Sequence, residues 1–182
     1  MIDSTIGKAS PQSDRPRAAD LKIERRSLSA ESEPMNDDEL AVIAHKMRKV
    51  LDQAELPETM VGFPYGCCHG ASMLLGTYLA ECGEQGFVII RGERGSHADN
   101  TSTSHTWLAR GDLVIDITAD QFRDSNASVI VERNSQWHRS FELTGSEPSD
   151  LREWGDNAPG LYPLMRDYPR LRDLVLLSDG RS

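Results

Sequence analysis

The stretch PYGCCHGASMLLGTYLAECG, residues 64–83, places two adjacent cysteines directly before a segment with helical spacing. Apolar side chains recur along it at offsets of three and four residues, namely Ala71, Leu74, Leu75, Tyr78, Leu79 and Cys82. That period is typical of an amphipathic helix. Pro64 and Gly66 interrupt regular structure before the segment, and Gly83 suits a helix C-terminus. We therefore predict a helix that starts near Cys67, with Cys82 in the core.

The thiol pair lies where a helix N-terminus favours ionisation. A thiol in the first turn has a lowered pKa because it is close to the positive end of the helix dipole. Metal binding is the other use of paired thiols, but Cys67, Cys68 and His69 are consecutive and lack the C-x2-C spacing of structural zinc sites. The spacing therefore argues against a metal site. On position both thiols qualify as a nucleophile, and the alternative is that the pair only fills space.

The chain before this helix divides into two parts. Residues 1–34 are rich in Ser, Asp, Arg and Pro without a sustained period, which predicts a disordered N-terminal tail. The sequence NDDELAVIAHKMRKVLDQAEL, which starts at Asn36, carries apolar residues on one helical face. Asn36 is a suitable N-cap, and the three acidic residues after it suit the helix dipole. We predict a helix here and assign residues 35–182 to one folded domain.

The segments after residue 86 are typical of strands. The run FVIIRGE, residues 87–93, is rich in β-forming residues, and residues 105–118 read as two strands around a tight turn. SVIVE, residues 128–132, and RSFEL, residues 139–143, are weaker strand candidates. The fold class is therefore α+β, with helices packed on an antiparallel sheet.

The C-terminal part shows weaker patterns. Residues 145–160 have the composition of a loop. Residues 161–178 are amphipathic but contain Pro163 and Pro169, which predict at best a broken helix because proline removes a backbone donor.

The hairpin at 105–118 places an imidazole and a carboxylate on the same face. If Gly111 and Asp112 form a two-residue loop, alternation gives one face to His105, Trp107, Val114, Asp116 and Thr118, and the other, apolar face to Leu108, Leu113, Ile115 and Ile117. His105 and Asp116 are then diagonal neighbours on adjacent strands, within reach of each other. An imidazole beside a carboxylate is the base and orienting group that activate a nucleophile.

Three segments carry a family resemblance: GCCHGAS at 66–72, HTW at 105–107 and VIDIT at 114–118. They resemble the core of transglutaminase-like proteins, within the papain-like cysteine hydrolase superfamily. In that group a G-x-C motif opens a helix, a small residue follows the cysteine four positions later, and H-x-W and D-x-T lie on consecutive strands. The resemblance selects Cys68 as nucleophile, with His105 as general base and acid and Asp116 as orienting group.

The same resemblance implies a papain/transglutaminase-like fold, and the chain is also similar to the small leader-peptide proteases of lasso-peptide maturation. Two departures stand out. His69 follows the cysteine, where papain-like enzymes often carry an aromatic residue such as Trp. The sequence does not identify which glutamine before Cys68, if any, takes the papain oxyanion role.

Other polar residues have simpler interpretations. Asp120 is a rival orienting group, but it lies beyond the hairpin and is expected to cap a turn. His69 and His97 are expected at the surface. The sequence places no carboxylate partner beside His45 or His138, and Trp107 packs either against the catalytic ring or in the core.

Net charge, cysteine content and the lack of long apolar runs argue against several classes of protein. The formal net charge of −9 argues against a general nucleic-acid binder, because phosphate contacts need clustered cations. Three cysteines, two of them adjacent, do not form a secreted disulfide framework. No apolar run is long enough to span a membrane and no signal-peptide core is present, so we expect a cytoplasmic protein, with export by a non-classical route still open.

The predicted activity is thiol-dependent attack on an amide carbonyl of a protein or peptide, with no cofactor. Peptide hydrolysis, deamidation of Gln or Asn side chains, and acyl transfer to an amine share this chemistry, and the sequence does not select among them. The alternative is a non-enzymatic interaction module that keeps the fold. The presence of all three triad residues argues against that alternative.

Overall fold

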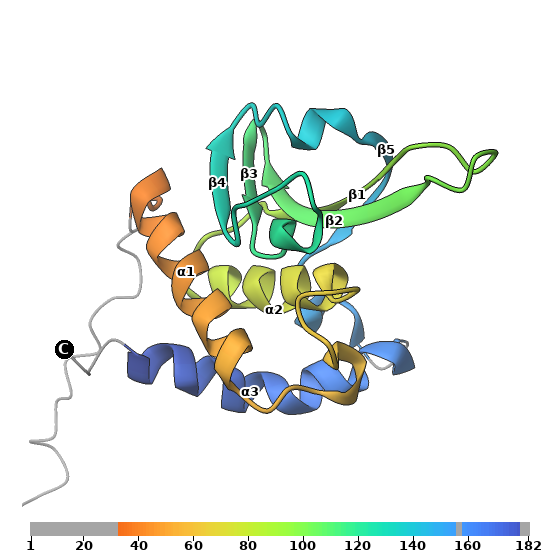
Figure 1. Cartoon of the computed structure of the whole chain (residues 1–182). Coiled ribbons are helices and arrows are strands. Elements are labelled where there is room, and N and C mark those ends of the chain that lie inside the picture. Colours follow the sequence, from red (N-terminus) through yellow and green to blue (C-terminus); the bar gives the residue numbers. More distant parts are fainter. Residues whose placement is uncertain (1–32, 156–157, 179–182) are drawn as a thin grey trace, which may run out of the picture. The chain divides into compact units, whose positions relative to one another are not determined.

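The computed structural model describes residues 33–155 and 158–178. The tail predicted at residues 1–34 lies outside this part, apart from its last two residues. Within the described residues three helices and five strands follow in the order α1, α2, β1 to β5, α3. Figure 1 shows the helices gathered on one side of the antiparallel sheet, which confirms the predicted α+β class. None of the helices in this part is long and apolar enough to cross a membrane.

Helix α1, Asp37–Gln53, begins with the predicted cap. Asn36 Oδ1 accepts the Glu39 N–H at 3.0 Å, and the Glu39 carboxylate accepts the Asn36 N–H at 2.9 Å. This reciprocal pair satisfies two backbone donors that a helix start leaves free. The buried face of the helix includes Leu40, Ala44, Met47 and Leu51.

Helix α2, Cys68–Glu81, is the centre of the domain. Cys67 is its N-cap, as the sequence predicts within one residue, and Gly83 adopts φ +92° just after the C-terminus. Every residue from Ala71 to Leu79 is buried. Burial on all sides, rather than on one stripe, arises because α2 contacts β2 on one side and α3 on the other (Figure 1).

The sheet has the strand order β4-β3-β2-β1-β5, and all neighbouring strands are antiparallel. The strand bounds are β1 Val88–Arg94, β2 Thr103–Arg110, β3 Leu113–Asp116, β4 Ile130–Arg133 and β5 Glu142–Pro148. Strands predicted at 87–93, 105–110, 113–118 and 128–132 are therefore present. The weaker candidate at 139–143 is shifted, because residues 138–140 form a 3-10 turn and β5 extends through residues expected to be loop.

The β2–β3 hairpin has the predicted register. Arg110 pairs with Leu113 and Leu108 with Ile115, so Gly111 and Asp112 are the two loop residues. Gly111 adopts φ +62°, a conformation that such tight hairpin turns require. Leu108, Leu113 and Ile115 face the helices and belong to the main core.

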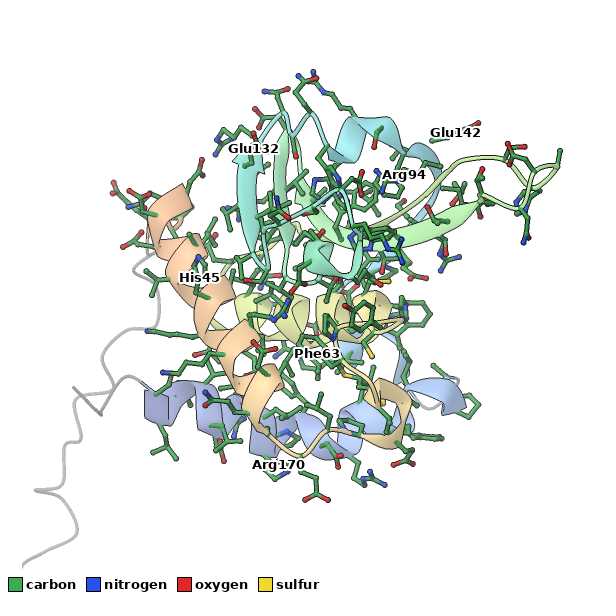
Figure 2. All side chains as sticks on the ribbon, viewed as in Figure 1. His45, Phe63, Arg94, Glu132, Glu142 and Arg170 are labelled. Atoms are coloured by element: carbon green, nitrogen blue, oxygen red, sulfur yellow. The ribbon has the colours of Figure 1, made fainter. Side chains whose placement is uncertain are left out.

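The opposite face of the sheet is also covered. Trp107, Ala109 and Phe141 form a second buried cluster there, with Phe122 and Trp137 packed against it. The loop between β4 and β5 supplies Trp137 and, at its end, Phe141. Figure 2 shows side chains filling the layer between sheet and helices and the space under this loop.

Helix α3, Tyr162–Leu177, is continuous, so the prediction of a broken helix was wrong. Pro163 lies in the first turn, where its missing N–H has no cost. Pro169 lies in the interior and costs about 3 kcal/mol. Burial of Leu164, Tyr168, Leu171 and Val175, at about 1.5–3 kcal/mol each, more than offsets that cost.

Candidate active site

The two adjacent thiols lie in different environments. Cys67 is 3% exposed, and its Sγ–H donates to the Tyr65 carbonyl at 3.3 Å. Burial, with the neighbouring Cys68, raises the pKa of the Cys67 thiol. Cys68 is partly exposed and is the first residue of α2. Burial alone would raise the pKa of Cys68, but its interactions with the His105 imidazole and with Thr106 hold that pKa below its usual value.

His105 and Asp116 form a closed pair. His105 Nε2 lies 2.7 Å from Asp116 Oδ2, and the two residues are 0% and 2% exposed. Burial would lower the pKa of His105, but the hydrogen bonds to Asp116 and Cys68 raise it to about 9. The hairpin parity thus brings together the residues that the sequence predicts for this site, and the N-terminus of α2 adds the thiol.

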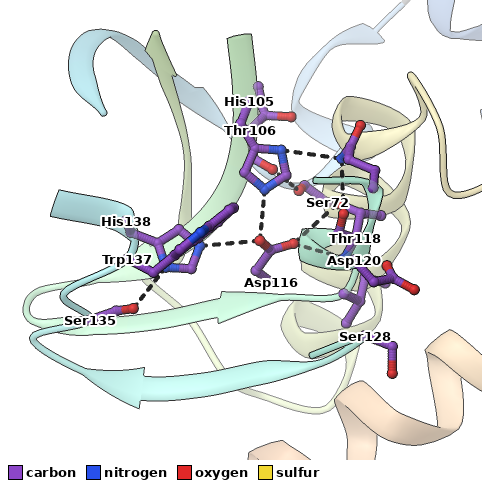
Figure 3. A network of polar contacts seen from close by, with 12 residues as sticks. Ser72, His105, Thr106, Asp116, Thr118, Asp120, Ser128, Ser135, Trp137 and His138 are labelled. Carbon is purple, nitrogen blue, oxygen red and sulfur yellow. Dashed lines mark hydrogen bonds and ion pairs between the residues drawn. The ribbon is translucent and has the colours of Figure 1, made fainter. Parts of the chain in front are cut away.

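A second histidine contacts the same carboxylate, which the sequence analysis missed. His138 Nε2 lies 3.1 Å from Asp116 Oδ2, and His138 Nδ1 lies 2.9 Å from Ser135 Oγ (Figure 3). Burial would raise the pKa of Asp116, but hydrogen bonds from His105 and His138 outweigh it and lower that pKa. His138 lies in an irregular loop 22 residues away, so no periodicity pointed to the contact.

The other oxygen of Asp116 is also satisfied. Asp116 Oδ1 accepts the backbone N–H of Thr118 at 2.8 Å and the Thr118 hydroxyl at 3.1 Å. Both carboxylate oxygens are therefore held, which fixes the direction in which Asp116 presents Oδ2 to the two rings.

Gln121 is a further contact that the sequence analysis did not identify. Its Nε2 lies 3.3 Å from His105 Nδ1 and donates to the Thr118 carbonyl at 2.9 Å. Its Oε1 accepts the Gly66 N–H at 3.3 Å. Gln121 therefore links the loop that precedes the thiols to the imidazole. The sequence offered only the turn signal in ADQF, residues 119–122.

Aromatic rings enclose the His105 imidazole. The nearest centroids are those of Phe122 at 4.9 Å, Trp107 and Trp137 at 5.7 Å, and Phe141 at 5.8 Å. Trp107 thus packs against the predicted catalytic ring and is buried as well, so both interpretations apply. Rings around an imidazolium attract its charge and fix its orientation.

Arg94 closes this aromatic group from outside. Its guanidinium lies 4.5 Å from the Phe141 centroid and forms two 2.7 Å hydrogen bonds to Asp124. Asp124 also accepts the Trp137 indole N–H at 3.3 Å.

The rival residues have other partners. Asp120 binds Arg48 through two hydrogen bonds of 2.7 and 2.8 Å, so it neither orients His105 nor caps the turn as expected. His69 lies beside the thiols, partly exposed, and contacts Glu147 at 2.7 Å. His97 is a surface residue, as expected, and His45 is exposed.

His105, Asp116 and His138 also form a group that could hold a metal ion, since one ligand atom from each lies within 4.8 Å of the others. The expectation of no metal concerned the cysteines and did not consider this group. The Nε2 atoms of His105 and His138 both hydrogen-bond to Asp116 Oδ2. These two hydrogen bonds account for the closeness of the three side chains without a metal ion. An ion would have to displace the proton from each of these nitrogens.

Comparison of the chain with protein-family models, with curated proteins and with solved structures found no match. The functional argument therefore depends on the site itself.

Proposed function

We propose that the chain is a papain/transglutaminase-like cysteine hydrolase or acyltransferase that attacks amide carbonyls of proteins or peptides. The observation that supports this most is the buried His105–Asp116 pair at 2.7 Å, whose imidazole interacts with Cys68 at the start of α2. Here the pKa of the thiol is lowered and the pKa of the imidazole is raised. Opposite shifts in interacting groups favour a thiolate–imidazolium pair at neutral pH.

The reaction follows from this pair. The Cys68 thiolate attacks the carbonyl carbon, and an S–C bond forms as the carbonyl π bond opens. The His105 imidazolium gives its proton to the leaving nitrogen as the C–N bond breaks. Water or an amine then attacks the thioester, His105 takes the proton of this nucleophile, and the thiolate leaves. Asp116 holds the ring in one tautomer throughout.

The start of α2 supplies backbone donors for the negative charge that develops on the carbonyl oxygen. The first backbone N–H groups of a helix lack intrahelical acceptors and carry the positive end of the dipole. Because Cys68 is the first residue of α2, these donors lie close to the carbon that it would attack. They are our candidates for stabilising the oxyanion, a contribution of about 3–4 kcal/mol per donor in other enzymes.

The test separates an enzyme from an interaction module. The intact chain is treated with limiting iodoacetamide at pH 6.5, and the adduct is located by mass spectrometry. We expect labelling at Cys68, loss of rapid labelling in Cys68→Ala and no change in Cys67→Ala. Equal, slow labelling of both thiols would favour the non-enzymatic module.

Activity assays then distinguish the three outcomes. A peptide library is incubated with the chain in the presence and absence of a primary amine. Mass spectrometry reports cleavage, a one-dalton gain from deamidation, or amine incorporation. Whichever product appears must be absent with Cys68→Ala and present with Cys67→Ala.

A further inference from the structure

A cavity of about 460 Å³ lies on the outer face of the sheet, opposite the face that α2 covers. Its apolar lining comes from Ile90, Trp107, Ala109, Val114, Phe141 and Leu143. Ser135, His138 and Arg139, from the loop between β4 and β5, add polar groups to its wall. An apolar cavity with a few converging polar groups is the usual form of a small-molecule site.

The polar wall contains a serine, a histidine and a carboxylate in mutual contact. Ser135 Oγ lies 2.9 Å from His138 Nδ1, and His138 Nε2 lies 3.1 Å from Asp116 Oδ2 (Figure 3). An ionised Asp116 only accepts hydrogen bonds, so Nε2 of His138 carries the proton. In the neutral ring Nδ1 is then free to accept the Ser135 hydroxyl proton. These are the mutual contacts of nucleophile, base and orienting group.

The serine hydroxyl does not cap the turn that follows it. The 3-10 turn His138–Ser140 that follows has no side-chain cap. The backbone carbonyl of Ser135, rather than its hydroxyl, accepts the Arg139 N–H at 3.2 Å. The hydroxyl is instead directed to the imidazole of a buried histidine.

We propose that Ser135, His138 and Asp116 form a second acyl-transfer site, which takes esters with a short apolar acyl group in the outer cavity. Ser135 Oγ attacks the ester carbon while its proton passes to His138 Nδ1. The C–O bond to the alcohol breaks, and that proton leaves with the alcohol. Water then attacks the acyl carbon, the bond from that carbon to Ser135 Oγ breaks, the carboxylic acid leaves, and a proton of the water passes through His138 to Ser135 Oγ. Arg139 provides positive charge in the cavity wall for the oxyanion.

This second site shares Asp116 with the proposed cysteine site but does not depend on Cys68. The apolar acyl group is specified by the six apolar side chains that line the cavity. Ser135 and His138 are only 2% and 3% exposed. This low exposure favours an unbranched acyl chain that enters the cavity with its end first.

The test uses an alkyl fluorophosphonate on the intact chain. Its phosphorus forms a bond to a serine oxygen and fluoride leaves. We expect an adduct on Ser135, located by mass spectrometry, and an about 100-fold slower reaction in His138→Gln, because general-base help is lost. Hydrolysis of p-nitrophenyl butyrate should fall in parallel. Ser140→Ala, a neighbouring exposed serine, should change neither.

Absence of an adduct on Ser135 of the unaltered chain, or an equal rate in a folded His138→Gln, would overturn the proposal. The adduct is mapped on the unaltered chain, so a failure of any variant to fold does not leave the question open. Cys68 alkylation is measured on the same samples. Absence of one reactivity from the unaltered chain, while the other is present, then shows which of the two proposed sites is wrong.

Discussion

Asp116 is the residue on which both proposed sites depend. Its Oδ2 accepts from His105 and His138, and its Oδ1 accepts twice from Thr118. A buried carboxylate with four donors stays ionised and fixes which nitrogen of each ring carries a proton.

The pH dependence of Cys68 follows from the direction of its pKa shift. Lowering the thiol pKa keeps a thiolate at pH values where an ordinary thiol, with a pKa of about 8.5, is mostly protonated. The partner imidazolium persists until pH rises through the His105 pKa of about 9. We expect fast alkylation at pH 6.5 in the unaltered chain and an at least tenfold slower rate in His105→Gln. An unchanged rate would mean that His105 does not stabilise the thiolate.

The shared carboxylate predicts an order of effects among three substitutions. Asp116→Asn should remove most thiol activation, because a neutral amide does not stabilise the imidazolium and its NH2 group cannot accept the Thr118 N–H. His138→Gln should reduce it less, because His105 keeps its partner. Asp120→Asn should leave it intact while lowering the free energy of unfolding by about 1–3 kcal/mol, because Arg48 loses a partner. Alkylation rates and urea unfolding measure both quantities. A silent Asp116→Asn beside a damaging Asp120→Asn would contradict the assigned orienting group.

At the scale of elements, a close approach in the sheet holds the aromatic rings around His105. Gly92 of β1 pairs with His105, and a Cβ added there would lie 2.8 Å from atoms of Trp107 and Phe141. A contact that short cannot be accommodated without moving a ring or a strand.

We therefore expect Gly92→Ala to lower the free energy of unfolding by about 1–3 kcal/mol and to slow Cys68 alkylation, through displacement of the rings that orient His105. Gly145→Ala is the matched control, because an added Cβ in β5 meets nothing within 4 Å. Urea unfolding and alkylation of both variants provide the comparison. Equal stability of the two would show that the sheet relaxes around the new methyl group.

The elements also show which parts of the fold local sequence could predict. The capped helix at Asn36, the helix after Cys67 and the Gly111–Asp112 hairpin each carry a period or a turn signal. His138 and Gln121 approach His105 through irregular turns, whose geometry no period describes. Pro169 predicted a break because a local cost is visible in sequence, whereas the burial of Leu171 and Val175 that offsets it is a tertiary effect.

At the scale of the whole chain, the core of the described residues draws on every α-helix. Residues of α1, α2, α3 and the inner face of the sheet form one buried cluster. Met35, just before α1, packs against this cluster. Its backbone N–H donates to Glu84 Oε1 at 2.7 Å. Glu84 in turn accepts from Arg110 at 2.7 Å, so the start of the domain is linked to the β2–β3 hairpin.

These contacts predict how far the chain can be shortened from its N-terminus without loss of stability. A chain that starts at Met35 keeps the Asn36 cap and the packing of Met35, and its α-amino group would retain a donor for Glu84. The segment 1–34, by contrast, shows no apolar period that could add to a core. We expect the thermal midpoint of this shorter chain to lie within a few degrees of that of the full chain, and Cys68 alkylation to be equally fast.

A chain that starts at Leu40 is the control, because it lacks the Asn36–Glu39 cap and the Glu84 contact. Its free energy of unfolding should fall by about 1–3 kcal/mol. A large drop already at Met35 would show that residues 1–34 contribute to the fold.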